Sequence, residues 1–180
     1  MDGNGTRHGG ERTVSTTKAS LTEGYKREHD QLDEGLAAMT DTLDRLQRQI
    51  DPSLLKALGK TRQFLEQVFV PHAEWEELAF YPALGELVRE RGDPNAAMFI
   101  DHREIMRKIR AFTEVVGRIE AGEHDPALVD QARILAYQIQ ALVDTHERKE
   151  EEIYVALLER HLSDREVVRV LSVGDQLGHD

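Results

Sequence analysis

Apolar residues recur at intervals of three and four along most of the chain, and this spacing is the main constraint on its fold. The first such run extends from Leu21 to Ile50. These intervals place side chains on one face of an α-helix, so the run predicts an amphipathic helix of about 30 residues. No segment of the sequence sustains the alternation that is typical of β-strands. The sequence therefore predicts an all-α fold.

Asp-Pro pairs divide the helical pattern into segments. They occur at residues 51–52, 93–94 and 125–126, and Gly92 and Gly122 stand shortly before the last two pairs. An aspartate can cap a helix N-terminus, a proline fits the first helical turn, and glycine is favoured just after a helix ends. The first, third and fourth predicted long helices accordingly cover residues 21–50, 94–121 and 126–161. The second begins at residue 52.

Two prolines, Pro71 and Pro82, lie inside the second predicted helix. Proline lacks an N–H and crowds the preceding turn. We therefore expect Pro71 to kink this helix, and Pro82 to end its main body or bend it. After the fourth helix, Ser163 and Glu166 have the spacing of a capping box, which predicts a short fifth helix.

The remaining boundaries give the domain organisation. Ser20 and Glu23 have the spacing of a capping box and predict the start of the first helix. The polar, glycine-containing sequence before it predicts a disordered tail over residues 1–20. Four long helices joined by short loops predict an up-down-up-down four-helix bundle over residues 21–161. A short C-terminal helix and tail are expected over residues 162–180.

The charge and composition exclude several classes of partner and site. The formal net charge is −11, from 34 acidic and 23 basic residues. Nucleic acids and anionic membrane surfaces attract basic proteins, so neither is expected as a partner. The absence of cysteine excludes disulfides, thiolate metal sites and cysteine nucleophiles. Because the sequence has no long apolar run and no secretory signal, we expect a cytoplasmic protein.

Each predicted long helix carries one histidine on its apolar face, and in two helices a glutamate follows one turn later. A lone inward histidine is usually a hydrogen-bonded core residue. Four histidines together with two carboxylates are a different case, because a buried carboxylate is costly unless a cation accompanies it. The set therefore indicates a buried metal site. The predicted metal ligands are His29, His72, Glu76, His102, His146 and Glu150.

The two halves of the chain repeat this pattern. The His-x-x-x-Glu motif at His72 recurs 74 positions later at His146, and the acidic-His pair at His29 recurs 73 positions later at His102. Four residues advance about 400° around a helix, so each histidine and its glutamate share a face roughly 6 Å apart. The set suffices for two metal ions, each bound by two histidines and bridged by both glutamates. Imidazole and carboxylate ligands favour iron or manganese, with zinc possible.

With these residues at these spacings, the chain resembles the hemerythrin-like, HHE cation-binding family of four-helix bundles over about residues 21–161. The resemblance implies two iron ions per chain in a non-haem, oxo- or hydroxo-bridged centre that handles hydrogen peroxide, dioxygen or nitric oxide. It would place His29 and His72 on one iron, His102 and His146 on the other, and Glu76 and Glu150 as bridges. The ferritin-like alternative needs Glu-x-x-His, which none of these histidines has.

Three positions near the predicted site leave alternatives open. Oxygen-carrying hemerythrins have a further histidine where this chain has Met106, so Met106 either leaves an open iron site or simply fills the core. Glu151 competes with Glu150 as a bridge, although five residues turn it about 140° away from His146. Tyr25 could donate a hydrogen bond, bind metal or only pack in the core.

These observations support two functional hypotheses. An open site at Met106 favours peroxide decomposition at a di-iron centre, and the alternative is a non-catalytic sensor or store for dioxygen, nitric oxide or iron. The sequence does not decide between an enzyme and a binding module, and it does not indicate a protein redox partner.

Acidic residues beside the ligands, including Glu77 and Glu147, are expected on a solvated helix face.

Overall fold

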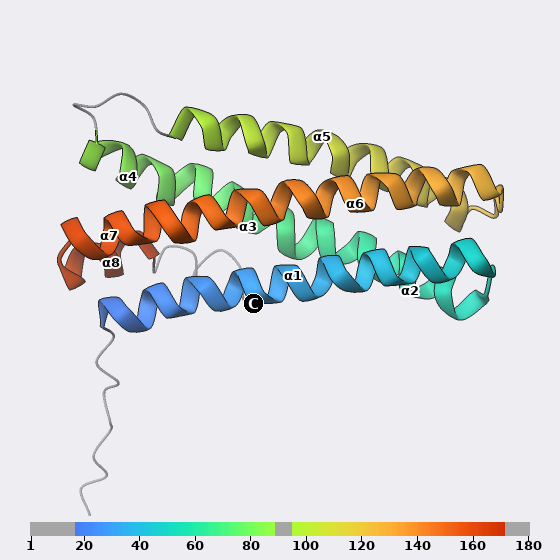
Figure 1. Cartoon of the computed structure of the whole chain (residues 1–180), viewed down its shortest axis with the longest axis horizontal. Helices are drawn as coiled ribbons and strands as arrows, with labels where there is room; N and C mark the ends of the chain where they lie inside the picture. The colour runs from blue at the N-terminus through green and yellow to red at the C-terminus, as the bar shows by residue number, and fades with distance from the viewer. Residues whose placement is uncertain (1–16, 89–94, 172–180) are drawn as a thin grey trace, which may run out of the picture.

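A computed structural model describes residues 17–88 and 95–171, and all the regular structure in these ranges is helical. This confirms the all-α prediction. Three segments, labelled η, are π-helical and continue the α-helices on either side without a break (Figure 1). The elements are α1 (Lys18–Arg48), α2 (Pro52–Phe64), η1 (Leu65–Phe69), α3 (Val70–Trp75), η2 (Glu76–Phe80), α4 (Tyr81–Val88), α5 (Asn95–Glu120), α6 (Pro126–Lys149), η4 (Glu150–Val155), α7 (Ala156–His161) and α8 (Asp164–Leu171).

The start of α1 corrects the predicted boundary. Thr17 is the N-cap, its hydroxyl accepts a hydrogen bond from the Ser20 backbone, and the Ser20 hydroxyl caps the Thr17 N–H in return. Ser20 is therefore the third residue of the helix and not its cap, because Thr17 is an equally good capping residue. The predicted tail over residues 1–20 was wrong for Lys18 onward, and residues 1–16 lie outside the described ranges.

Two of the three Asp-Pro pairs begin helices as predicted. The Asp51 carboxylate accepts the Ser53 N–H at 2.8 Å, and the Asp125 carboxylate accepts the Ala127 N–H at 2.9 Å. Gly122, after α5, has a φ of +98°, the left-handed conformation that favours glycine. The third pair, at residues 93–94, and the glycine before it lie outside the described residues.

The second long helix runs through both of its prolines. Of the two alternatives predicted for Pro82, an end of the helix is wrong, because α4 continues to Val88, and a bend stays a prediction. One residue separates each proline from the π segment before it. That residue closes the π turn: the Val70 N–H donates to the Leu65 carbonyl, and the Tyr81 N–H donates to the Glu76 carbonyl. A wide π turn shifts the carbonyl that a proline ring would otherwise crowd, and thereby lets the helix continue.

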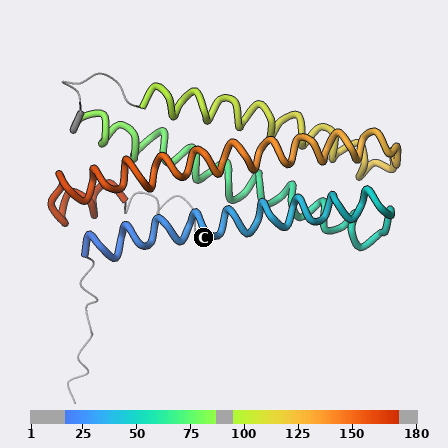
Figure 2. Tube along the Cα trace, in the orientation of Figure 1, coloured from blue at the N-terminus to red at the C-terminus, as the bar shows by residue number. Residues whose placement is uncertain are grey.

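The described helices pack side by side as long rods. The rods, in chain order, are α1, the continuous run from α2 to α4, α5, and the continuous run from α6 to α7. α5 packs along α6, and α1 packs along both α6 and α2. The α1–α2 and α5–α6 turns lie at one end of the bundle, and α8 folds back near α7 at the other (Figures 1 and 2). Ser163 precedes α8, and its backbone N–H and hydroxyl both bond to the Glu166 carboxylate, as expected for the predicted fifth helix.

Two clusters of buried side chains fill the bundle. We call the larger one the apolar cluster; it occupies the end with the α1–α2 turn and includes Leu36, Met39, Leu43, Leu58, Phe112 and Ile139. We call the other the aromatic cluster; it includes Tyr25, Trp75, Phe80, Tyr81, Met98 and Tyr154. Between them lies the polar region described below.

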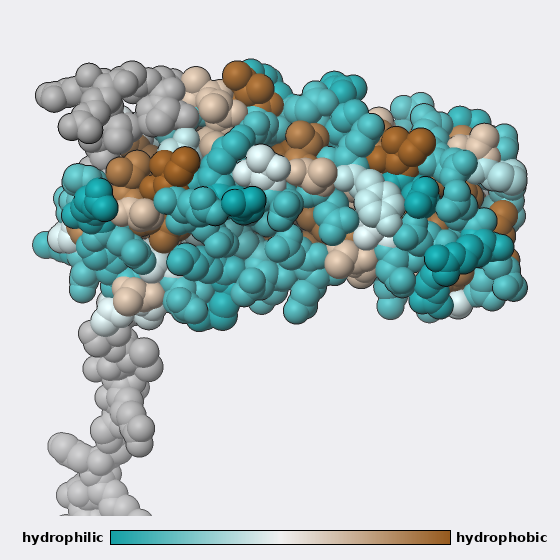
Figure 3. Space-filling view, in the orientation of Figure 1, coloured by the Kyte–Doolittle hydropathy of each residue, from teal (hydrophilic) through white to brown (hydrophobic). Residues whose placement is uncertain are grey.

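The surface shows no large apolar area on the face in Figure 3. Hydrophobic side chains there stand mostly as isolated patches among hydrophilic ones. Among the described residues, no helix combines the length and the apolar character needed to cross a membrane.

Candidate metal centre

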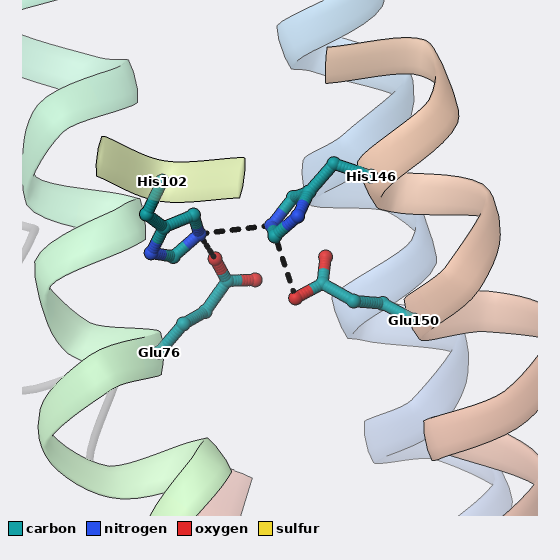
Figure 4. A group of neighbouring side chains, drawn as sticks. All are labelled: Glu76, His102, His146 and Glu150. Atoms are coloured by element: carbon teal, nitrogen blue, oxygen red, sulfur yellow. Dashed lines mark hydrogen bonds and ion pairs between the residues drawn. The ribbon is translucent and has the colours of Figure 1, made fainter. Parts of the chain in front are cut away.

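The six residues predicted as ligands meet in the middle of the bundle. They come from all four rods, and five of them are at most 3% exposed. The sixth, His72, has a side chain that is 10% exposed. Figure 4 shows four of the six, with side chains from α5, α6 and the η2 and η4 segments pointing toward one another. The structure thus brings together His29, His72, Glu76, His102, His146 and Glu150.

Each glutamate directs its two oxygens toward different histidines. Glu76 Oε1 lies 3.0 Å from His72 Nε2 and 3.9 Å from His29 Nε2, whereas its Oε2 lies 3.3 Å from His102 Nε2. Glu150 Oε1 lies 3.4 Å from His146 Nε2, whereas its Oε2 lies 3.5 Å from His29 Nε2. Both carboxylates therefore span the centre.

These contacts define two donor sets. The first donor set consists of His29 Nε2, His72 Nε2, Glu76 Oε1 and Glu150 Oε2. The second donor set consists of His102 Nε2, His146 Nε2, Glu76 Oε2 and Glu150 Oε1, and its two ring nitrogens are 2.8 Å apart. Each set contains two imidazole nitrogens and one oxygen from each carboxylate.

Two buried atoms support a cation in the first donor set. His29 Nε2 and Glu150 Oε2 are buried, have no hydrogen-bond partner and lie 3.5 Å apart. Leaving such atoms unpaired costs free energy, and a positive ion between them would satisfy both. Imidazole nitrogen and carboxylate oxygen are also the ligands that iron, manganese and zinc accept. The residues present therefore fit a metal ion.

A second shell of carboxylates contacts the outer nitrogen, Nδ1, of every histidine. Since a carboxylate accepts hydrogen bonds, it favours a proton on Nδ1 and leaves the Nε2 lone pair facing the centre. Each carboxylate comes from the preceding rod, so the four contacts form a closed ring around the bundle. The contacts are Glu28 with His72 at 3.4 Å, Glu77 with His102 at 3.0 Å, Asp101 with His146 at 3.4 Å and Glu151 with His29 at 3.0 Å.

These contacts between outer carboxylates and histidines were not predicted from the sequence. The side chain of Glu77 is 39% exposed, which agrees with a partly solvated face, but its carboxylate also contacts His102 Nδ1, which was not predicted. The internal repeat contained the signal. An acidic residue precedes both His29 and His102, and another follows both glutamates of the centre.

Two buried tyrosines hold the carboxylates. Tyr25 Oη donates a hydrogen bond to Glu76 Oε1 at 2.5 Å, which selects the donor role among the alternatives left open for it. Tyr81, which the sequence analysis missed, donates to Glu150 Oε1 at 2.5 Å and lies 3.2 Å from His102 Nε2 and 3.1 Å from His146 Nε2. Burial and the nearby carboxylates raise the pKa of both phenols, so both act as hydrogen-bond donors.

The charges of the centre are divided unequally between the two glutamates. Burial lowers the pKa of His72, but the Glu76, Glu28 and Glu150 carboxylates together hold that pKa well above its usual range. Burial raises the pKa of Glu76, but the neighbouring His72, with the nearby His102 and His29, holds that pKa well below its usual range. Burial, together with the Glu76 charge, raises the pKa of Glu150 well above its usual range. A cation binding here would replace protons on His72 and Glu150.

The two central glutamates have the same local backbone. Glu76 is the first residue of η2, and Glu150 is the first residue of η4. π turns inside α-helices occur mainly at functional sites. The 74-residue repeat therefore extends from the ligands to the backbone that carries them.

The other open positions are resolved by their contacts. Glu150 is fully buried in the centre, whereas Glu151 lies outside it, against His29. Met106 packs against the apolar cluster and also lines a surface cavity of about 490 Å³ beside Glu77. Glu147 is 6% exposed, and its Oε1 is buried without a hydrogen-bond partner, so the solvated position predicted for it was wrong.

The fold and this centre define a helical-bundle protein with a buried cation site of imidazoles and carboxylates. The family model of the Hemerythrin HHE cation binding domain matches residues 20–158. The chain therefore belongs to the hemerythrin HHE cation-binding domain family, as its sequence pattern predicted. A comparison with curated proteins finds no match.

Proposed function

We propose that this chain binds two metal ions, one in each donor set, in an up-down-up-down bundle with Glu76 and Glu150 as bridges. The observation that carries the proposal is the division of each carboxylate, with one oxygen in the first donor set and the other in the second. A single-ion site would not need both oxygens of both carboxylates. Iron is the ion we expect, with manganese or zinc less favoured.

The chemistry that we propose for the centre is reaction with hydrogen peroxide, dioxygen or nitric oxide, and foremost the decomposition of peroxide. When bound, a pair of iron ions supplies two-electron redox chemistry. The protein orients the imidazoles through the outer carboxylates, holds the bridges through Tyr25 and Tyr81, and surrounds the centre with buried side chains that limit water. The cavity beside Met106 is lined by Glu77, whose carboxylate contacts His102 of the second donor set, and we propose it as the side from which small molecules approach.

The metal content and optical spectrum of protein purified without added metal test the binding proposal. We expect about two irons per chain and near-ultraviolet oxo-to-iron absorption. His102→Ala removes a nitrogen of the second donor set and should lower the iron content, whereas His124→Ala removes an exposed histidine and should leave it unchanged. Protein that holds no metal, or zinc alone, would contradict an iron centre.

A peroxide titration of the iron-loaded protein tests the proposed reaction. Sustained oxygen evolution that is lost in His102→Ala and retained in His124→Ala would support peroxide decomposition. A single stoichiometric change in the spectrum, without oxygen evolution, would instead support the non-catalytic sensor or storage role.

A further inference from the structure

Tyr81 occupies a position in the centre that its hydrogen bond to Glu150 does not fully explain. Its Oη is in contact with three members of the second donor set: both ring nitrogens and one carboxylate oxygen. We propose that Tyr81 is a further ligand of the second donor set and binds its metal ion through the phenolate oxygen. This inference rests on the proposed function, because it requires an ion at that position.

The distances within the second donor set support the assignment. Two ligand atoms that each lie about 2.1 Å from one ion, at a right angle, are about 3 Å apart. Tyr81 Oη lies 3.2 Å from His102 Nε2 and 3.1 Å from His146 Nε2, and these nitrogens are 2.8 Å from each other. The three atoms are therefore spaced like neighbouring ligands of one ion. Glu150 Oε1, 2.5 Å from Tyr81 Oη, completes the same corner.

The π turn of η2 explains how Tyr81 reaches this corner. In an α-helix, a residue five positions after Glu76 would point about 140° away from it. The Tyr81 N–H instead bonds to the Glu76 carbonyl, closing a five-residue turn that places Tyr81 one turn above Glu76 on the same side. Its side chain is 0% exposed, and its ring packs between Phe99 and Tyr154, with ring centroids 5.5 and 6.2 Å away.

The internal repeat shows that this oxygen is specific to the second donor set. The position equivalent to Tyr81 in the other half, 74 residues later, is Val155, which carries no donor atom. Tyr25 lies beside the first donor set, and its Oη donates to Glu76 Oε1. It stacks on the His72 ring with centroids 6.0 Å apart. We therefore assign Tyr25 the role of supporting a ligand and Tyr81 the role of being one.

Coordination by Tyr81 has a simple proton balance. The phenol loses its proton when its oxygen binds the ion, because the charge of the cation favours the phenolate, and the proton leaves to solvent. No electrons are exchanged in this step.

The test is the visible spectrum of the ferric protein, because a phenolate bound to ferric iron gives a charge-transfer band and resonance-enhanced ring vibrations. Wild type, Tyr81→Phe and Tyr25→Phe are loaded with iron, and the spectra are compared per bound iron. We expect the band and the vibrations in wild type and in Tyr25→Phe, and their loss in Tyr81→Phe. Retention in Tyr81→Phe, or loss in Tyr25→Phe alone, would overturn the assignment.

A second variant keeps the test independent of whether Tyr81→Phe folds. The chain has four tyrosines, and replacing the other three, Tyr25, Tyr137 and Tyr154, with phenylalanine leaves Tyr81 as the only phenol. This triple variant should retain the phenolate signals, and their absence contradicts the proposal. Wild type that binds two irons without these signals overturns the role of Tyr81 alone, whereas wild type that binds no iron overturns the proposed function as well.

Discussion

The two central regions of the bundle, the apolar cluster and the metal centre, are stabilised by different means. Every member of the apolar cluster is hydrophobic, so burial itself favours folding, by roughly 25 cal/mol for each Å² removed from water. The metal centre buries six ionisable side chains in a similarly enclosed space, and burial of such groups opposes folding. The same rods thus contain one region whose burial favours folding and one whose burial opposes folding unless a cation accompanies the buried charges.

This difference indicates that the two regions have separate roles in the fold. We expect the apolar cluster to set the register of the rods, and that register to position the side chains of the metal centre. The six ligands already converge in the structure, with pair distances of 2.8–3.9 Å. Four predictions test how independent the two regions are.

Metal removal should have the largest effect and act on the centre. At a metal concentration about 1,000 times the Kd, binding stabilises the fold by about 4 kcal/mol, which chelation would remove. Thermal unfolding with and without chelator measures the loss. His102→Ala serves as the control, because a protein that cannot hold the ion should unfold at nearly the same temperature in both conditions.

Amide hydrogen exchange would locate the effect of metal removal. We expect protection to fall around η2 and η4 and to persist in α1 near Leu43 and in α5 near Phe112. An equal loss in all these segments would contradict the proposed independence of the two regions.

Phe112→Ala should be the converse experiment. Phe112 is fully buried in the apolar cluster, so truncation is expected to cost about 3–5 kcal/mol of unfolding free energy. Denaturant unfolding measures this cost, and the iron content per folded chain should remain that of wild type. A large fall in iron content would show that the centre depends on the packing of the far end.

Glu77→Gln should weaken the centre without altering the apolar cluster. The change removes the charge that holds His102 Nδ1, and loss of such an outer contact typically costs 10- to 100-fold, or about 1.4–2.7 kcal/mol, in metal affinity. Competition with a chelator of known affinity measures it. Glu74→Gln, an exposed change on the same rod, is the matched control. Equal affinities of the two variants would argue against an orienting role for Glu77.

Glu147→Gln should have an effect that depends on pH and falls to near zero in acid. Burial, with the nearby Asp33 charge, raises the pKa of Glu147 from 4.5 to about 9, so the folded state holds a proton that the unfolded state loses between these values. Its contribution is present below pH 4.5 and is lost as the pH rises toward 9. In metal-free protein the variant should be about 1–3 kcal/mol more stable than wild type at pH 8, with little difference at pH 4. Equal stabilities of the two proteins at pH 8 would contradict the raised pKa.

The features that were predicted correctly depend only on the position of a residue along a single helix. The all-helical fold and the convergence of His29, His72, His102 and His146 follow from spacing, because a side chain on the apolar face of a helix must point into the bundle. Tyr81 was missed for a definite reason. At 3.6 residues per turn, a residue five positions after Glu76 faces away from it, whereas the π turn of η2 places Tyr81 on the same side.

The remaining misses involve contacts between helices. Glu77 and Asp101 are polar residues beside apolar ones, a pattern that solvated faces share. Which neighbouring rod each one reaches depends on rotation and register in the folded bundle. The burial of Glu147 likewise depends on how closely α1 packs along α6. A single sequence carries little information about either.

The closed ring of outer carboxylates makes the four rods mutually dependent. Each rod provides one histidine and also the acid that orients the histidine of the next rod. A shift of any one rod along its axis would disturb two imidazoles at once, one by moving its own ring and one by withdrawing the support of its neighbour. Metal affinity at the centre should consequently depend on the alignment of all four rods together, and misalignment of any one rod should lower it.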